Sequence, residues 1–550
     1  MTTAVNKFRE LITAISSRRY FILAALFAFT VFFIGLGSRH LRGGDEPRVA
    51  GIAAEIFLDG NWVEPRLNDK PFLEKPPLYF WADALSMQLF GRNNFAAKLP
   101  SAAAAFFGAL SLFALARGLG MSGFGALLSV VLLSTAAQYW NYGRKCMVDI
   151  FLAVFIAFAM WAFWEACRSG KNKNAFLWFL FFALSLGGAL FSKGLIGVAI
   201  PCSALFFYLA VNNFYIEKKL HLKPWLFLFA GAALSFIPIA LWIWALYEKS
   251  GYEAVRTVVW TKNFGRFTGS HAEHVEPFWY YLPKLFEQLQ PWTIFLPFAL
   301  WFGIRKVIRE KDAKSLFMLC WLVIPYLLLM VSAGKRQVYV SPLYAAEILL
   351  IADMLDQIFS GKFKLPEKWD YVNLLSKIAG ILLCAGLFCG ALAFVIIAAV
   401  GGMNWSAYIA PGFMLFCGAL TLNGMLKEKI SRTALGLLAG LALTYISVDT
   451  SVRPIKNARK SYHDMFKYCE EQMRGGTLYL YRPIERESGA ALFYLGVNCP
   501  LYDFQNTKVA SGALVLINRD FSDRFIKVGF TPIKEFKVDS RKYQVMKYEH

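Results

Sequence analysis

Two short charged segments, residues 44–48 and 73–77, carry the side chains best suited to chemistry. They read Gly-Asp-Glu-Pro-Arg and Leu-Glu-Lys-Pro-Pro. A carboxylate can accept a proton or orient a hydroxyl group, and an ammonium group can stabilise a departing anion. Both segments lie in one polar loop after the first apolar stretch, whereas a transporter is expected to carry its ionisable residues near the middle of the membrane. This placement predicts an enzyme that works at a membrane surface.

The elements that must position this loop are membrane helices. The chain of 550 residues is 57% hydrophobic and only 17% charged. Apolar stretches of about 20 residues recur along most of it, which predicts an all-α polytopic bundle with about thirteen spans. The predicted spans are 20–38, 95–117, 122–139, 146–165, 175–191, 194–212, 225–247, 290–304, 315–333, 338–357, 376–401, 405–425 and 432–449.

The distribution of basic residues predicts which loops share a side. Clusters such as Arg18-Arg19, Lys218-Lys219 and Arg305-Lys306 all fall on one face under this span count. The positive-inside rule makes that face cytoplasmic. Loops 39–94 and 248–289 and the C-terminus then face the opposite, extracytoplasmic side. The net charge of +21 is therefore explained mostly by the membrane topology and for the rest by phosphate binding, and nucleic acid is a poor explanation for it.

Two domains are predicted, a transmembrane domain at 1–454 and a small extracytoplasmic α/β domain at 455–550. In the second, helices are expected near 461–473 and 489–495, and strands near 477–481, 513–517, 534–538 and 543–547. Cys469 and Cys499 lie on the oxidising side, where a disulfide between them is possible but not demanded. Short helices lying in the membrane interface are expected after Pro47 and over 77–90, with two more near 252–264 and 277–288.

The order of the polar motifs resembles a known family. Taken together they resemble the GT-C glycosyltransferases that use polyprenyl-phosphate sugars, nearest to the lipid A aminoarabinose transferases, with protein O-mannosyltransferases as more distant relatives. The resemblance covers the chain almost end to end. The motifs are Asp45-Glu46, Glu74-Lys75-Pro76-Pro77, Arg144 to Asp149, Ser192-Lys193-Gly194, Asn263 to Phe267 followed by His274 and Pro277, and Gly334-Lys335-Arg336 before Tyr339 and Pro342.

The resemblance implies transfer of a sugar from a polyprenyl-phosphate donor to an extracytoplasmic acceptor. The same chemistry follows from location, because a sugar outside the cytoplasm must arrive on a membrane lipid whose phosphate can leave. A single displacement inverts the anomeric centre. The expected catalytic residues are Asp45, as base or acceptor-orienting group, with Asp149 and Glu46. The expected phosphate-binding residues are Lys75, Arg144, Lys193, Arg266, Lys335, Arg336 and Tyr339.

Purely structural roles also fit some of the same residues. Asp45 and Glu46 before Pro47 suit a helix N-terminus, and Lys75 suits an interfacial anchor. Asp149 suits the water boundary of its span. Glu74 and His274 could bind one divalent metal ion, as the resemblance implies, although a surface role fits the histidine equally. No nucleotide cofactor is expected, because the formal G-x-G-x-x-G at 118–123 joins two spans and follows no strand.

The expected partners are the lipid-linked sugar, a glycolipid such as lipid A, and membrane lipids, with the protein acting as a monomer. The expected location is the bacterial inner membrane, with the active site and the C-terminal domain facing the periplasm. A lipid-linked sugar flippase and a protein O-glycosyltransferase stay open as alternatives. The sequence names neither the sugar nor the acceptor.

The predicted topology can be tested by cysteine labelling. Single cysteines at Asn61, Ser270 and Ser511 should react with a membrane-impermeant reagent in intact spheroplasts, because all three positions are predicted to be extracytoplasmic. Protection of any one of them would contradict the span count.

Overall fold

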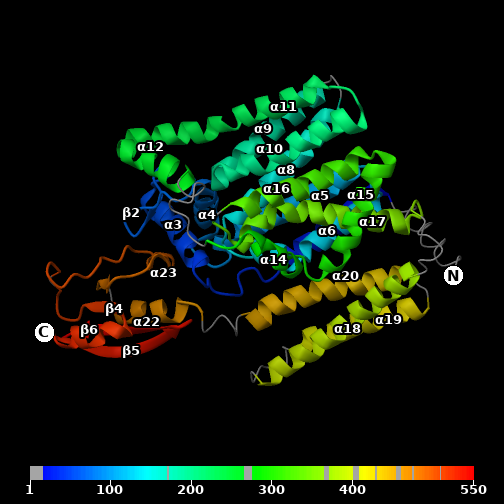
Figure 1. Ribbon diagram of the computed structural model, residues 1–550. Helices are drawn as coiled ribbons and strands as arrows, with labels where there is room; N and C mark the ends of the chain where they lie inside the picture. Colours follow the sequence, from blue (N-terminus) through cyan, green and yellow to red (C-terminus); the bar gives the residue numbers. More distant parts are fainter. Residues whose placement is uncertain are drawn as a thin grey trace.

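The structure is a computed structural model that describes residues 16–169, 173–264, 275–332, 334–363, 371–400, 408–427, 430–453, 460–473, 476–507 and 509–549. Its long helices lie side by side in a bundle, and the C-terminal part lies at one end of that bundle, beside α3 and α4 (Figure 1). The predicted multi-pass helical class is confirmed by these long apolar helices.

Every predicted span contains a helix. Eight helical segments among the described residues are long and apolar enough to cross a membrane, or nine with one bent pair. The full predicted number of spans stays a prediction. The helices of the bundle are α2 (Ser17–Phe33), α5 (Leu99–Gly118), α6 (Gly123–Ser134), α7 (Ala137–Gly143), α8 (Asp149–Arg168), α9 (Lys173–Lys193), α10 (Ile196–Val211), α11 (Leu222–Leu234), α12 (Phe236–Arg256), α15 (Leu296–Arg305), α16 (Ala313–Val331), α17 (Tyr344–Phe359), α18 (Tyr371–Val400), α19 (Ile409–Leu426) and α20 (Ile430–Ser447).

The predicted span 122–139 is broken, which corrects the expectation of one continuous helix. Helices α6 and α7 meet at an angle of 70°. At the break, the indole N–H of Trp292 donates to Thr135 Oγ1 over 2.9 Å, and the backbone N–H of Ala137 donates to the Gln290 carbonyl over 2.9 Å. Because these contacts satisfy polar groups that the break exposes, the chain can turn inside the bundle. The turn delivers α7 to the segment between Arg144 and Asp149.

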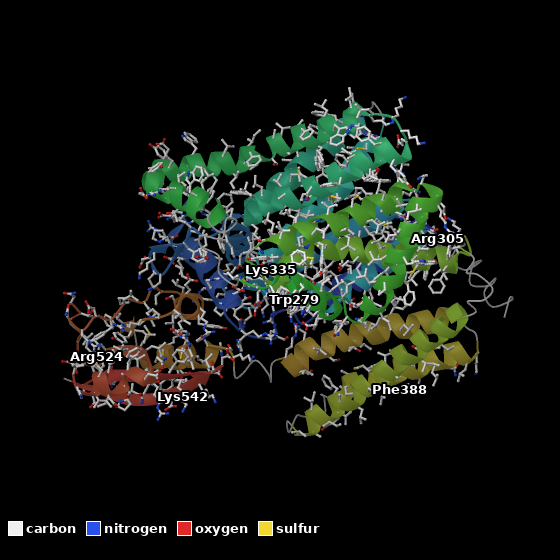
Figure 2. The ribbon with its side chains drawn as sticks, viewed as in Figure 1. Trp279, Arg305, Lys335, Phe388, Arg524 and Lys542 are labelled. Carbon is white, nitrogen blue, oxygen red and sulfur yellow. The ribbon has the colours of Figure 1, made fainter. Side chains whose placement is uncertain are left out.

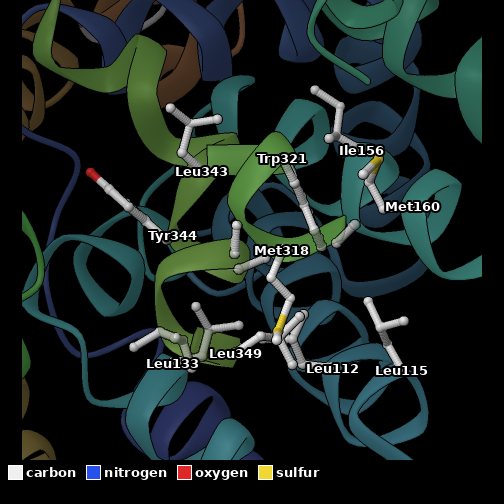
Figure 3. Packing of buried hydrophobic residues seen from close by; sticks show 14 of the residues in the cluster. Leu112, Leu115, Leu133, Ile156, Met160, Met318, Trp321, Leu343, Tyr344 and Leu349 are labelled. Atoms are coloured by element: carbon white, nitrogen blue, oxygen red, sulfur yellow. The ribbon is translucent and has the colours of Figure 1, made fainter. Parts of the chain in front are cut away.

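Side chains from helices far apart in the sequence interlock at the centre of the bundle. Figure 3 shows Leu112 of α5, Ile156 of α8, Trp321 of α16 and Leu349 of α17 in one cluster. All four are fully buried. Close packing, rather than exclusion of water, holds helices together in a membrane, so this cluster fixes the helix ends that carry the polar loops.

The two helices predicted in loop 39–94 are present. They are α3 (Asp45–Asp59) and α4 (Leu78–Phe90), joined through a hairpin of β1 (Arg66–Leu67) and β2 (Lys70–Pro71) and followed by a 3₁₀ turn, η1 (Ala96–Lys98). Their surroundings differ from the expectation, because α3 does not lie exposed in the interface. Glu55 of α3 is buried and accepts the backbone N–H groups of Asn68 and Asp69 over 2.6 and 2.8 Å.

The second loop region continues from α12, whose helix is interrupted at Gly251 with a φ of 74°. It goes on as the π-helical segment η3 (Thr257–Phe264), and later as η4 (Phe278–Tyr280) and α14 (Tyr281–Gln288). Lys249 donates to the Asn61 side chain over 2.6 Å, so the described parts of the two loops are in contact. The shorter connecting helices are η2 (Asn212–Ile216), η5 (Trp292–Phe295), η6 (Lys306–Glu310), η7 (Gln337–Leu343) and η10 (Val448–Val452).

The C-terminal part contains a four-stranded sheet in the order β3-β4-β6-β5, with β3 parallel to β4 and the other pairs antiparallel. Cys469 and Cys499 are both buried in its core as free thiols, with no disulfide between them. The elements are α22 (His463–Met473), β3 (Leu478–Leu480), α23 (Glu485–Leu495), β4 (Leu514–Asn518), η11 (Arg519–Phe521), α24 (Ser522–Ile526), β5 (Phe530–Val538) and β6 (Arg541–Tyr548).

Helix α23 lies directly on α3 through a pair of glycines. A Cβ atom added to Gly51 would lie 2.3 Å from the Gly489 Cα, and one added to Gly489 would lie 2.4 Å from the Pro47 carbonyl oxygen. Backbone atoms cannot yield as a flexible side chain would, so only glycine permits this approach. The C-terminal part is thereby attached to the helix that begins with Asp45.

Filling this contact should loosen the C-terminal part. Gly489→Val is expected to destabilise it by about 2–3 kcal/mol or more, because the added methyl groups overlap backbone. Thermal unfolding in detergent and limited proteolysis measure the effect. Gly412→Ala in α19 is the matched control, since a Cβ there meets no atom within 4 Å. Equal stability of the two variants would contradict the packing described.

Candidate functional site

Asp45 is the first residue of α3, and its carboxylate does not cap that helix. The cap position is Gly44, with no side-chain cap hydrogen bond. The carboxylate instead accepts from Arg48 Nη2 over 2.5 Å and from Arg336 Nη2 over 3.1 Å, and the side chain is 31% exposed. Burial alone would raise the pKa of Asp45, but the charges of Lys75, Arg48 and Arg336 outweigh it and hold the pKa below its usual value. Asp45 is therefore an ionised carboxylate that solvent can reach.

The charge of Lys75 acts on Asp45. It lies between β2 and α4, where Pro76 and Pro77 lead into the helix. Within the part of the chain that the structure describes, its ammonium group makes no hydrogen bond and no ion pair within 4 Å. Burial, together with the positive charges of Arg48 and Arg336, lowers the pKa of Lys75 to about 8 despite the opposing charges of Asp45 and Glu74. An anion arriving here would relieve that repulsion.

Three more predicted residues come together in a second cluster. Lys193, at the end of α9, pairs with the carboxylate of Asp149, at the start of α8. The Lys193 ammonium also lies 4.2 Å from the ring centroid of Tyr339 in η7. Asp149 is buried, so its charge depends on this partner. The structure thus joins one predicted carboxylate to two predicted phosphate-binding residues.

The neighbours Lys335 and Arg336 have different surroundings. Lys335 is buried, and its ammonium donates to the backbone carbonyls of Glu276 and Ser332 over 3.0 and 2.6 Å. Arg336 reaches Asp45 and keeps 37% of its side chain exposed. Figure 2 shows Lys335 near the middle of the molecule, whereas Arg305 lies at the end of the bundle away from the C-terminal part. Lys335 ties two loops together, and Arg336 remains accessible to a ligand.

Glu46 and Arg144 lie in a buried network rather than beside Asp45. The Arg39 guanidinium binds both oxygens of Glu46, over 2.7 and 2.8 Å. Arg144 binds Asp449 over 2.6 Å and also donates to two backbone carbonyls at the end of α2 and just after it. Burial would raise the pKa of Glu46, but the Arg39 charge and hydrogen bond hold it near 2. These contacts join the end of α2, the start of α3, η10 and the segment before α8.

Three residues of these networks were missed by the sequence analysis. Arg48 follows Asp45 by one helical turn, a spacing that favours an ion pair and could have been recognised. Asp449 lies in the last predicted span, where a charged residue is rare and is usually paired or functional. No sequence pattern pointed to Arg39, because its pairing with Glu46 depends on the tertiary fold.

The predicted metal pair cannot be assembled from the described residues. His274 lies outside them, as does Arg266. Among the residues that are described, no group of three or more His, Cys, Asp or Glu side chains is close enough to hold a metal ion. Glu74 is partly buried, and its charge acts on Lys75. The metal stays a prediction, and no step of the chemistry is assigned to it.

Comparisons with known proteins confirm the resemblance noted in the sequence. The family described as dolichyl-phosphate-mannose-protein mannosyltransferase matches residues 74–244. The undecaprenyl phosphate-alpha-4-amino-4-deoxy-L-arabinose arabinosyl transferase of Erwinia tasmaniensis is 32% identical over 61% of this chain and 59% of its own length. The protein of that name from Edwardsiella ictaluri is 30% identical over 66% and 64%. The chain thus spans about three fifths of the length of these curated relatives.

One solved structure shares the fold over almost the whole chain. It is the crystal structure of ArnT from Cupriavidus metallidurans bound to undecaprenyl phosphate, with a TM-score of 0.72 at 20% identity, covering 96% of this chain and 97% of that one. The apo crystal structure of the same protein matches with a TM-score of 0.71. The predicted membrane fold is therefore confirmed in its overall architecture.

The pKa of Lys75 predicts a pH dependence for anion binding. With a pKa of about 8 in the free protein, the ammonium loses its proton above that pH, while a bound phosphate would keep it charged. Affinity for a simple probe such as dodecyl phosphate should therefore fall by about tenfold or more between pH 7 and pH 9.5. Lys75→Arg stays charged and should show a much flatter profile, and Lys75→Ala should bind weakly at every pH.

Isothermal titration in detergent measures these affinities. Lys70→Ala is the matched control, because Lys70 is an exposed lysine in the neighbouring strand β2. Parallel pH profiles for the wild type and Lys75→Arg would contradict the assignment.

Proposed function

We propose that the protein is an integral membrane glycosyltransferase that moves an aminoarabinose-type sugar from undecaprenyl phosphate to an extracytoplasmic lipid, with lipid A as the acceptor. The donor and sugar are those in the names of its curated relatives. The observation that carries the proposal is the ionised Asp45 carboxylate, held by Arg48 and Arg336 beside Lys75 at one end of a bundle with the ArnT fold.

Lys75 and Arg336 are proposed to bind the donor phosphate. Lys75 has no hydrogen-bonding partner among the described residues, and Arg336 is partly exposed. As the bond between sugar and phosphate breaks, negative charge grows on the phosphate oxygens, and positive groups aimed at those oxygens lower the barrier. Arg266 stays a further candidate from the resemblance.

Asp45 is proposed to act on the acceptor. An ionised carboxylate can accept a proton from an attacking hydroxyl group or hold the acceptor in line with the sugar carbon. Attack from the face opposite the phosphate needs no covalent intermediate with the enzyme, so the anomeric centre inverts. Asp149, paired with Lys193 beside Tyr339, is proposed to line the sugar site.

Glu46 and Arg144 are proposed to position the site rather than to touch substrate. Both are buried, and both are bound by partners on other elements. Lys335 is assigned the same kind of role, because two backbone carbonyls receive its ammonium group.

The proposed location is the bacterial inner membrane, with about thirteen spans and the site facing the periplasm. The proposed boundary between the transmembrane domain and the C-terminal α/β domain lies at 454/455. The protein is proposed to act without a nucleotide cofactor.

Protein is the second candidate acceptor, because the matching family at residues 74–244 is described as a protein mannosyltransferase. Incubation of the purified protein with undecaprenyl-phosphate aminoarabinose and either lipid A or unfolded peptides distinguishes the two. Sugar on peptide alone would favour the second candidate. Movement of the donor lipid across a vesicle membrane without transfer would favour the flippase alternative.

Asp45→Asn tests the proposed chemistry. An amide keeps the size of the side chain but is neither a base nor charged, so transfer should fall by about two orders of magnitude or more. Binding of undecaprenyl phosphate should persist, because Lys75 and Arg336 remain. Transfer to lipid A and lipid binding are measured separately.

Asp59→Asn is the control for this change. Asp59 lies at the other end of α3, is exposed, and accepts only the backbone N–H of Asn61 over 2.8 Å among the described residues. That variant should transfer at nearly the wild-type rate. Similar activity in the two variants would remove Asp45 from the catalytic site.

A further inference from the structure

The C-terminal part reaches the candidate site through one ion pair. Arg48 binds Asp45 with its Nη2 atom, and its Nη1 atom donates to Glu485 Oε2 over 2.7 Å. Glu485 is the first residue of α23 and lies 437 positions after Arg48 in the sequence. One guanidinium group therefore separates the proposed base from a carboxylate of the C-terminal part.

The start of α23 is held in place independently of Arg48. The carboxylate of Glu487 accepts the backbone N–H of Ile484 over 3.0 Å and a tyrosine hydroxyl of β6 over 2.5 Å, so the first turn of the helix is bound to the sheet. One turn after the helix begins, Gly489 lies against the backbone of α3. The backbone of Glu485 is therefore fixed beside the first turn of α3 whether or not its side chain meets Arg48.

The Arg48 guanidinium is divided between two acids. A guanidinium with a single carboxylate partner commonly binds it through two parallel N–H···O bonds. Here Glu485 and Asp45 each receive one Nη atom, and the second oxygen of Asp45 accepts from Arg336 over 3.1 Å. Glu485 thus occupies one half of a group that could otherwise bind both oxygens of Asp45.

The charges around Asp45 make this division important for a base. Burial raises the pKa of Asp45, but the charges of three neighbouring cations, Arg48 among them, outweigh it and lower the pKa. A carboxylate becomes a weaker base as its pKa falls. The negative charge of Glu485 lies on the far side of Arg48 and partly offsets that guanidinium. Because the Glu485 side chain is 50% exposed, the ion pair itself contributes little to folding stability.

We propose that Glu485 is a positioning residue, which holds one half of the Arg48 guanidinium and thereby keeps Asp45 free to act as the base. The proposal rests on the proposed function and deepens it, because it makes the C-terminal part a component of the reaction site. In the transfer step, the acceptor oxygen bonds to the anomeric carbon, and the bond from that carbon to the phosphate oxygen breaks with its electron pair on the phosphate. Asp45 takes the proton of the acceptor hydroxyl group. Glu485 acts on this step only through Arg48.

Glu485→Gln tests this role, because it removes the charge and keeps the size of the side chain. Purified full-length protein in detergent is assayed with undecaprenyl-phosphate aminoarabinose and lipid A. The kcat of transfer should fall by about fivefold or more, because Arg48 then turns both of its Nη atoms to Asp45 and weakens the base. The KM for the donor should stay within about twofold of the wild-type value, since Lys75 and Arg336 are unchanged.

Further variants separate positioning from a structural role. Glu485→Asp keeps the charge on a shorter side chain and should retain more of the wild-type kcat than Glu485→Gln does. In an Asp45→Asn background, Glu485→Gln should leave the residual transfer of radiolabelled sugar unchanged, because no base remains for it to affect. The Tm of every variant should stay within about 2 °C of the wild-type value. Glu471→Gln, which changes an exposed acid of α22, is the matched control and should transfer at the wild-type rate.

Two results would overturn the role of Glu485 and leave the proposed function in place. One is a wild-type kcat in Glu485→Gln, in a protein that transfers sugar to lipid A. The other is an equal proportional loss of transfer from Glu485→Gln with and without the Asp45 carboxylate, which would indicate a purely structural effect. A wild-type protein that transfers sugar neither to lipid A nor to peptide would contradict the proposed function and, with it, the role of Glu485.

Discussion

Two buried arginine–carboxylate contacts hold the polar end of this protein together. Arg39 binds Glu46, and Arg144 binds Asp449, with all four side chains almost completely removed from solvent. Removing charges from water costs several kcal/mol per ion, so such pairs contribute little net stability. Loss of one partner, however, leaves an uncompensated buried charge. The network therefore holds the start of α3, the segment before α8 and η10 in one arrangement.

That arrangement explains why neighbouring acids and bases behave differently. Asp45 and Glu46 are adjacent in sequence, yet Glu46 points into the network and Asp45 into the accessible cluster with Arg48 and Arg336. Lys145 and Arg144 divide in the same way, with Arg144 buried and Lys145 partly exposed. In each pair the buried member is bound to other elements of the fold, and its neighbour remains partly exposed. Burial and neighbouring charges shift the pKa values of accessible groups such as Asp45 and Lys75.

Local patterns in the sequence predicted much of the fold. Apolar length located the helices, and the two helices of loop 39–94 followed from turn prolines and helical spacing. The break between α6 and α7 was not predictable, because it depends on Trp292 and Gln290, which come about 150 residues later. The burial of α3 was missed for the same reason, since Gly489 covers it from the other end of the chain. For the candidate site, Asp45, Lys75, Glu46 and Arg144 were all predicted from residue type and location, and those local signals could not show that Glu46 and Arg144 have buried partners.

The close approach of Gly51 and Gly489 links the beginning of the polypeptide to its end. Asn68 also donates to the Cys499 carbonyl and accepts from its N–H, so the hairpin of the first loop depends on the same late segment. During synthesis, α3 emerges long before the residues that cover it. The carboxylate at its N-terminus therefore reaches its final surroundings only after nearly the whole chain has been made. A chain that stops before Gly489 lacks the segment that covers α3, so the surroundings of Asp45 stay incomplete.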